Sequence, residues 1–159
     1  PNSVRWHLIG HLQRNKIRRT LPLVDLIHSL DTARVVEADD RIAAELGLRP
    51  KLLLEINDSG EASKDGFNPD SVRAAWPQLR DLNHVDIRGL MTMAPLTSTP
   101  ETARPVFETL RHLRDELAGG DPHRLPELSM GMTGDFEAAI AEGATIVRIG
   151  SALWQGLAP

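Results

Sequence analysis

Two short stretches near the end of the sequence place a glycine beside a hydroxyl residue, and each follows an apolar run typical of a strand. Gly131 and Thr133 follow the first run, and Gly150 and Ser151 follow the second. In parallel α/β folds such turns open helices at one edge of the sheet, where unpaired backbone N–H groups and the helix dipole favour an anion. The two stretches therefore predict a site for a phosphorylated ligand, with ordinary strand-to-helix turn chemistry as the alternative.

A positive charge belongs to the same region. Arg148 lies in the apolar run TIVRIG, just before the second glycine turn. A buried arginine needs a partner, because an unpaired charge inside a protein is costly. The partner is either a carboxylate, such as Glu127 or Asp135, or a bound ligand that faces the guanidinium. Spacing alone leaves both interpretations open.

Other residue types that carry chemistry give weaker signals. His7 lies in the apolar run VRWHLIG, where a hydrogen-bonded core histidine is the simpler interpretation, and the six histidines show no metal-ligand spacing. The absence of cysteine excludes a disulfide, a thiolate zinc site and a cysteine nucleophile. The sequence has no tyrosine, and none of Lys16, Lys51 and Lys64 is predicted to face the phosphate site, as a Schiff-base lysine must. We therefore expect no metal ion and identify no good lysine for covalent attachment of a ligand.

Six apolar runs alternate with helical patterns, which is typical of parallel strands joined by crossover helices. The predicted strands span 4–10, 26–30, 51–57 and 85–93, and two more lie within 128–156. The predicted helices lie at 13–19, from a cap at Asp31 to a stop at Gly47, at 69–82, after Pro100 and within 128–156. Such a chain closes as a barrel or stays open as a doubly wound sheet. An eight-stranded barrel typically needs about 250 residues, so two strands would be missing from this one.

Length and composition indicate one soluble domain. The 159 residues suffice for a single buried core, and the net charge of −4 with a pI near 5.9 argues against a nucleic-acid surface. The basic run 14–19 is better explained as a solvated helix face than as a nucleic-acid patch. No apolar run approaches the ~20 residues that cross a bilayer and no signal peptide is visible, so we expect no membrane partner and a cytoplasmic location. The start at Pro1 suggests part of a longer protein.

Four stretches together resemble a known family, the pyridoxal-phosphate-binding proteins of vitamin B6 homeostasis, often called the YggS or PROSC family. The stretches are WHLIGHLQRNK, NDSGEASKDG from 57 to 66, IRGLMTM and, most specific, LSMGMTGDFEAAIAEGATIVRIGSALWQG. They occur in the family's order along the whole sequence. The resemblance implies a TIM-like (β/α)8 barrel of the alanine racemase N-terminal type, as one domain over residues 1–159 with the first two βα units missing.

The resemblance also implies a ligand, pyridoxal 5′-phosphate, bound at the strand ends by a carrier or regulator without turnover of its own. Arg148 would face the pyridine nitrogen and keep it unprotonated, which weakens the ring as an electron sink. The phosphate would be held at Ser129, Gly131, Met132, Thr133, Gly150 and Ser151, and the residues near the ring would be Asn57, Met91 and His7. This small molecule is the only partner that the sequence predicts, and the oligomeric state is not indicated.

The sequence departs from the family in two ways. Thr133 stands where the family usually has serine, which conserves the hydroxyl. The family's first strand carries the lysine that bonds covalently to the cofactor, and this sequence does not include that strand, so we expect non-covalent binding by this chain itself. A six-strand remnant would also leave two unpaired sheet edges and exposed apolar strand faces.

Three other functions stay open at this point. A pyridoxal-phosphate-dependent racemase of the related barrel type would need a lysine and a tyrosine on opposite faces of its substrate. A non-catalytic phosphate-binding module would use the same glycine turns. A phosphate-binding isomerase would need a carboxylate base at a strand end, and Glu55 is the only candidate within the most clearly patterned predicted strands.

Overall fold

The computed structural model describes residues 4–57, 65–95 and 97–156. Within these residues the chain forms one sheet of six parallel strands, and each strand pairs with the next along the chain. The strands are β1 (His7–Leu8), β2 (Leu26–Leu30), β3 (Lys51–Glu55), β4 (Asp86–Met91), β5 (Glu127–Met132) and β6 (Ile146–Arg148). This consecutive order is that of a barrel, because the order in a doubly wound sheet reverses at a switch point. It confirms the predicted barrel type and excludes the doubly wound sheet.

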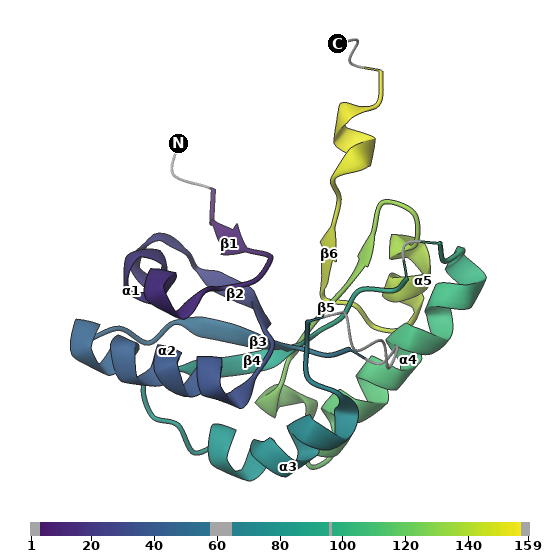
Figure 1. Ribbon diagram of the computed structural model, residues 1–159. Helices are drawn as coiled ribbons and strands as arrows, with labels where there is room; N and C mark the ends of the chain where they lie inside the picture. Colours follow the sequence, from purple (N-terminus) through teal and green to yellow (C-terminus); the bar gives the residue numbers. More distant parts are fainter. Residues whose placement is uncertain (1–3, 58–64, 96, 157–159) are drawn as a thin grey trace.

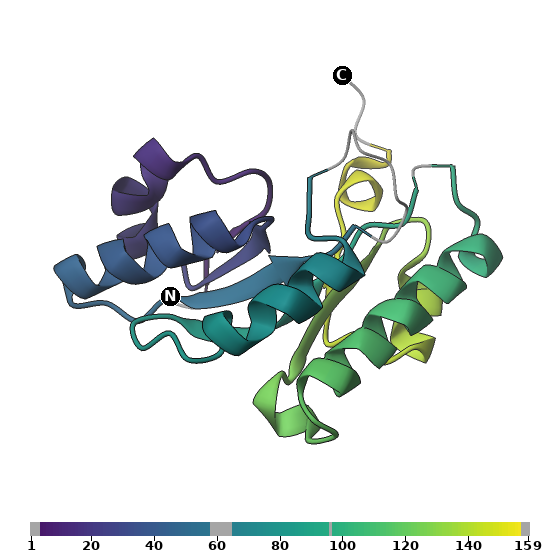
Figure 2. The ribbon, with the colours of Figure 1, turned by 60° about the horizontal axis from the view of Figure 1, so that its bottom comes forward.

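Helices cover one face of the sheet. They are α1 (Ile17–Thr20), α2 (Ala33–Leu46), α3 (Pro69–Leu79), α4 (Pro100–Leu117) and α5 (Phe136–Ala141), with the short 3-10 helices η1 (Arg14–Lys16), η2 (Leu21–Leu23), η3 (Pro122–Arg124) and η4 (Ser151–Trp154). Figure 1 shows a curved sheet with α2 to α5 on its outer side, and Figure 2 brings these helices forward. We call the face without helices the concave face. No helix among the described residues has both the length and the apolar character needed to cross a membrane.

Alternate residues of each strand pack on opposite faces of the sheet. Leu52 and Leu54 of β3 join the main core against the helices, whereas Leu53 packs on the concave face. The apolar layer on the concave face consists of Leu26, Leu53, Met91 and Ile146. Because both faces of β3 are covered, a nearly continuous apolar run is what this strand requires.

Local signals set the ends of the longer helices. Gly47 ends α2 with a φ of 64°, a left-handed conformation that glycine adopts without steric cost. Asn68 starts α3 by accepting the Ser71 N–H at 2.8 Å. The same helix ends at Leu79, earlier than predicted and soon after Pro77, which cannot donate a backbone hydrogen bond.

Two local predictions are wrong. Asp31 does not cap α2, because Thr32 is the N-cap and the Asp31 carboxylate is hydrogen-bonded to His11 Nδ1 at 2.8 Å. The buried strand expected at 4–10 is reduced to the two residues of β1, and Trp6 is 68% exposed. In the described part of the chain β1 pairs with β2 alone, so one of its sides has no strand to cover it.

The two edges of the described sheet are β1 and β6. Large apolar side chains near these edges are exposed, namely Val4, Trp6, Ile9, Met132, Leu153 and Trp154. The expected unpaired edges are therefore present among the described residues, but the exposed apolar side chains lie mostly outside the strands, whose apolar residues on the concave face are largely buried.

Asp39 makes the stability of this fold depend on pH. Its side chain on α2 is 0% exposed, and neither carboxylate oxygen has a hydrogen-bond partner among the described residues. Burial raises the pKa of Asp39 from 3.8 to about 7. The folded protein therefore holds a proton that the unfolded chain has released. Stability falls as the pH rises from the unfolded towards the folded pKa, and it stays low above that value.

Asp39→Asn removes this titration. We expect the free energy of unfolding to fall more steeply in the wild-type protein than in Asp39→Asn between about pH 5 and pH 8, with the difference between the two proteins changing by up to about 3 kcal/mol. Urea denaturation followed by circular dichroism measures both. Glu37→Gln, at an exposed position of the same helix, is the matched control. The same pH dependence in Asp39→Asn as in the wild type would show that another group is responsible.

Candidate functional site

Polar side chains gather on the concave face, at the carboxyl ends of the strands. His28, Glu55 and Arg148 each lie two residues beyond a member of the apolar layer, on the same face of the sheet, because strand side chains alternate. We call the whole set the polar layer, and its members are His7, His28, Glu55, Ser129 and Arg148. In parallel folds this end of the sheet is where ligands bind.

Two neutral acceptors hold the guanidinium of Arg148. Its Nη1 donates to the Ser129 hydroxyl at 2.7 Å, and its Nη2 donates to the Thr92 carbonyl oxygen at 3.0 Å. The two carboxylates proposed from the sequence as its salt-bridge partners, Glu127 and Asp135, are hydrogen-bonded elsewhere. Burial lowers the pKa of Arg148, yet a guanidinium stays charged in proteins. The salt-bridge interpretation is therefore wrong for both candidates, and no described carboxylate neutralises this charge by direct contact.

A row of hydrogen bonds continues from Ser129 across the concave face. Ser129 Oγ lies 2.8 Å from His28 Nδ1, and His28 Nε2 lies 3.0 Å from His7 Nδ1. Burial is the main cause that lowers the pKa of His28 to about 4, followed by the charges of His7 and Arg148, so His28 is neutral near pH 7. His28 is absent from the residues predicted by sequence, and its place in the alternating run LIHSL is the signal that identifies it.

Thr133 joins the two loops that the sequence predicts to hold a phosphate. Its Oγ1 accepts hydrogen bonds from the backbone N–H groups of Gly150 and Ala152, both at 3.4 Å. The two donors therefore point at one place, as an anion site requires. Their distances exceed the usual range for N–H···O bonds, so both donors are only weakly satisfied. Ser151 lies between them at the start of η4 and is exposed.

The helices expected to point at this place are short. The first, α5, has six residues, and the second, η4, is a 3-10 helix of four residues. Individual N–H groups, more than helix dipoles, therefore make the place attractive to an anion. Gly131 lies beneath it at a φ of 91°, where a Cβ would come within 2.6 Å of Ala139, so glycine allows α5 to pack on β5. The Met132 N–H donates to the Asp135 carboxylate at 2.6 Å.

The residues predicted to lie near a ring come from three strands. Met91 is fully buried in the apolar layer, directly beside Ser129 in the strand register. Asn57 lies just beyond the end of β3, where its N–H donates to the Phe67 carbonyl at 2.8 Å. His7 is exposed on β1 at the outer end of the hydrogen-bond row. The structure thus places Met91 beside Ser129 at the base of the polar layer and the other two at its margin.

Glu55 has an unusual electrostatic environment, which the sequence does not reveal. Its side chain is 7% exposed. Burial raises the pKa of Glu55 to about 7, with contributions from Asp31 and Asp65, although the charges of Arg148 and His11 act in the opposite direction. Glu55 therefore holds its proton to a higher pH than an ordinary glutamate does.

Three donor atoms from segments far apart in the sequence meet near Glu55. His11 Nδ1 and carboxylate oxygens of Asp31 and Asp65 lie within 4.8 Å of one another, beside a hollow of about 890 Å³. Ligand spacing along the sequence cannot detect a group that three separate loops supply. The hydrogen bond between His11 and Asp31 explains their contact, and we assign no ion to the group.

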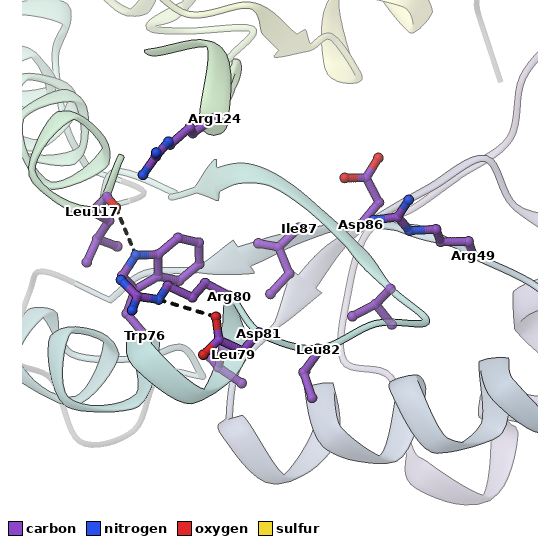
Figure 3. Close-up of a pocket in the computed structure, with 11 residues that line it drawn as sticks. Arg49, Trp76, Leu79, Arg80, Asp81, Leu82, Asp86, Ile87, Leu117 and Arg124 are labelled. Atoms are coloured by element: carbon purple, nitrogen blue, oxygen red, sulfur yellow. Dashed lines mark hydrogen bonds and ion pairs between the residues drawn. The ribbon is translucent and has the colours of Figure 1, made fainter. Parts of the chain in front are cut away.

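Another hollow lies at the opposite end of the sheet. It has a volume of about 550 Å³ and is lined by residues before β3 and β4 and at the ends of α3 and α4. Figure 3 shows Trp76 donating its indole N–H to the Leu117 carbonyl at 2.8 Å, with Arg80 close to Asp81. This pocket is remote from the polar layer and is not part of the predicted site.

The chain is similar to known proteins over nearly its whole length. The family model described as "Alanine racemase, N-terminal domain" matches residues 3–158, which places the chain in that class of barrel domain. The chain is 43% identical over 152 residues to the pyridoxal phosphate homeostasis protein of Aquifex aeolicus, covering 96% of this chain and 67% of that protein. For the protein of the same name from Synechocystis the identity is 38%, with coverages of 96% and 70%. The chain belongs to the family of pyridoxal phosphate homeostasis proteins, as its four sequence stretches predict.

Solved structures agree with this assignment. PipY of Synechococcus elongatus PCC7942, solved with pyridoxal phosphate bound, is 44% identical to the chain with a TM-score of 0.86, covering 94% of this chain and 70% of that one. An alanine racemase of Clostridium difficile is 17% identical with a TM-score of 0.70, covering 93% of this chain and 38% of that one. At that identity the likeness concerns the fold alone, and it supports the barrel of the alanine racemase type.

We expect the Glu55 carboxyl group to titrate near pH 7 when its carboxyl carbon is followed by NMR. Arg148→Met removes a positive charge that lowers the pKa of Glu55, so the midpoint should move to higher pH. Arg124→Met, at the opposite end of the sheet, should leave it unchanged. A midpoint in the ordinary glutamate range, or one that is the same in Arg148→Met, would contradict this account of the polar layer.

Proposed function

We propose that this protein binds pyridoxal 5′-phosphate non-covalently at the carboxyl ends of β4, β5 and β6. In this proposal it is a carrier or regulator of the cofactor in the cytoplasm, without turnover of its own. The observation that carries the proposal is the pair of convergent backbone donors at Thr133, close to a guanidinium that no described carboxylate contacts. The name of the related proteins and the pyridoxal phosphate bound to PipY support this choice of ligand.

The anion-binding end of the site fits a phosphate. Phosphate oxygens would replace the Thr133 hydroxyl as acceptors of the Gly150 and Ala152 N–H groups, and that hydroxyl could then donate to the phosphate. A Cβ built on Gly150 meets nothing within 4 Å, so a ligand can approach the backbone there. Ser151 would add a second hydroxyl. Gly131 and Met132 would shape the loop that carries Thr133.

At the other end, Arg148 would face the pyridine nitrogen. Pyridoxal phosphate supplies an aldehyde and a ring that can withdraw electrons from a bound group. A permanently charged guanidinium beside the ring nitrogen disfavours protonation of that nitrogen and so weakens the withdrawal. Ser129 would orient Arg148. Met91 would form an apolar floor, with Asn57 and His7 at the margin of the ring.

Binding without catalysis is the more economical proposal for this chain. A racemase of the related barrel type would need a tyrosine, and this sequence has none. Lys16 lies in η1 and Lys51 starts β3 at the end of the sheet opposite the polar layer, while Lys64 is outside the described residues. We therefore propose that neither Lys16 nor Lys51 forms a covalent bond with the cofactor.

Thr133→Val removes the hydroxyl at the proposed phosphate end. We expect it to weaken pyridoxal phosphate binding about tenfold, because a hydrogen bond to a charged group is lost. Binding of pyridoxal, which lacks the phosphate, should be weaker in the wild type and unaffected by the substitution. Isothermal titration calorimetry measures both ligands.

The control for this experiment is Thr109→Val, an exposed threonine on α4. Equal affinity of the wild type for pyridoxal phosphate and pyridoxal would contradict the phosphate site. Equal affinity for inorganic phosphate and pyridoxal phosphate would instead favour a simple phosphate-binding module.

Non-covalent binding predicts that borohydride will not fix the cofactor to the chain. We expect the intact mass to remain that of the unmodified protein after saturation with pyridoxal phosphate and reduction. One cofactor added per chain would contradict this expectation, and peptide mapping would then identify the lysine. Racemisation of alanine above the background of the free cofactor would contradict the proposal that the protein has no turnover.

A further inference from the structure

The hydrogen-bond row from Arg148 to His7 connects strands that are not neighbours in the sheet. Ser129 lies on β5 and His28 on β2, with β3 and β4 between them in the strand order. Their contact at 2.8 Å therefore runs across the concave face and not along a pair of adjacent strands. The row as a whole links the two edges of the described sheet, β6 and β1.

The hydrogens in this row have one arrangement that satisfies its buried members. A guanidinium can only donate, so Ser129 Oγ accepts from Arg148. The Ser129 hydroxyl then donates its own hydrogen to His28 Nδ1, which is its one available acceptor among the described residues. His28 consequently carries its own hydrogen on Nε2 and donates it to His7 Nδ1.

The reverse arrangement leaves a buried hydrogen without a partner. If His28 carried its hydrogen on Nδ1, the Ser129 hydroxyl would accept from both Arg148 and His28. Its own hydrogen would then have no acceptor among the described residues. Ser129 is 0% exposed and His28 is 1% exposed, so water cannot readily compensate. The row is therefore directional, from Arg148 outward to His7.

We propose that His28 is a positioning residue, which holds Ser129 and Arg148 in place and fixes His7 with its hydrogen on Nε2. His7 then offers an N–H at the outer end of the row, suited to an oxygen acceptor of the ligand. The part that concerns the ligand rests on the proposed function, whereas the order of hydrogens follows from the contacts alone. A neutral His28 is required, and burial together with the charge of Arg148 on β6 lowers its pKa.

The first test needs no ligand. In ¹⁵N NMR of the free protein we expect both His28 and His7 to carry their hydrogen on Nε2, with a coupling between His28 Nε2 and His7 Nδ1 across the hydrogen bond. His28 should also stay neutral at about pH 6, below the ordinary pKa of a histidine side chain. A hydrogen on His28 Nδ1, or no coupling between the two rings, would overturn the directional row.

The second test uses two substitutions that separate the bonds of His28. In His28→Asn the side-chain oxygen can still accept from Ser129, but the amide is too short to reach His7. In His28→Leu both bonds are lost. We expect His28→Leu to weaken pyridoxal phosphate binding about tenfold and His28→Asn to recover part of that loss. His123→Leu, an exposed histidine on η3, is the control, and circular dichroism checks that each variant folds.

The two tests fail in different ways. If the wild type does not bind pyridoxal phosphate, the proposed function fails while the NMR result still decides the hydrogen-bond row. If the wild type binds and both His28 variants bind equally well, the positioning role fails while the proposed function stands. Equal losses in His28→Asn and His28→Leu would also overturn the proposal, because they would show that the bond to Ser129 contributes nothing.

Discussion

A guanidinium charge held by neutral acceptors is the constraint on which the rest of this site depends. An arginine that is largely withdrawn from water is normally paired with a carboxylate, because desolvation of the charge is costly. Here Arg148 is bound by a serine hydroxyl and a backbone carbonyl. The carbonyl belongs to Thr92, whose own N–H and hydroxyl are bonded to the neighbouring strands. The ends of β3, β4 and β5 therefore fix the charge. That charge adds to the lowering of the His28 pKa by burial, and it opposes the rise of the Glu55 pKa that burial causes.

The curvature of the sheet makes this arrangement possible. A flat sheet would keep β2 and β5 three strand spacings apart, on the order of 14 Å, whereas a sheet bent towards a barrel brings their side chains into contact. The apolar layer covers the concave face towards the amino-terminal ends of the strands. On β2, β3 and β6 a member of the polar layer follows two residues further along the strand. The same strands therefore carry an apolar layer and a polar layer within a few residues of each other.

Much of the fold is readable in the sequence because it depends on local periodicity and on turn residues. The run 26–30 appears in the structure with the predicted bounds, and Gly47 and Pro100 mark helix ends as expected. The strand at 4–10 fails because its apolar residues lie at an edge that the described chain does not cover, and apolar content alone cannot tell an edge from a core.

Only the part of the site that depends on residues close together in the sequence can be predicted. The glycine and hydroxyl residues near the end of the chain are close together in the sequence, so their meeting at Thr133 can be anticipated. The contact between His28 and Ser129 joins positions 101 residues apart, and no spacing rule reaches that far. The role of Asp31 is misread because capping is a local pattern, whereas its actual partner, His11, comes from the preceding loop.

The long hydrogen bonds at Thr133 determine how the two loops meet a ligand. Because one hydroxyl contacts both the Gly150 and the Ala152 N–H groups, the two loops already meet at Thr133 before any anion arrives. An incoming oxygen exchanges with a weakly held acceptor and need not organise two mobile segments. An anion that binds where the loops already meet has less loop entropy to offset, so preorganisation adds to the contacts in holding it.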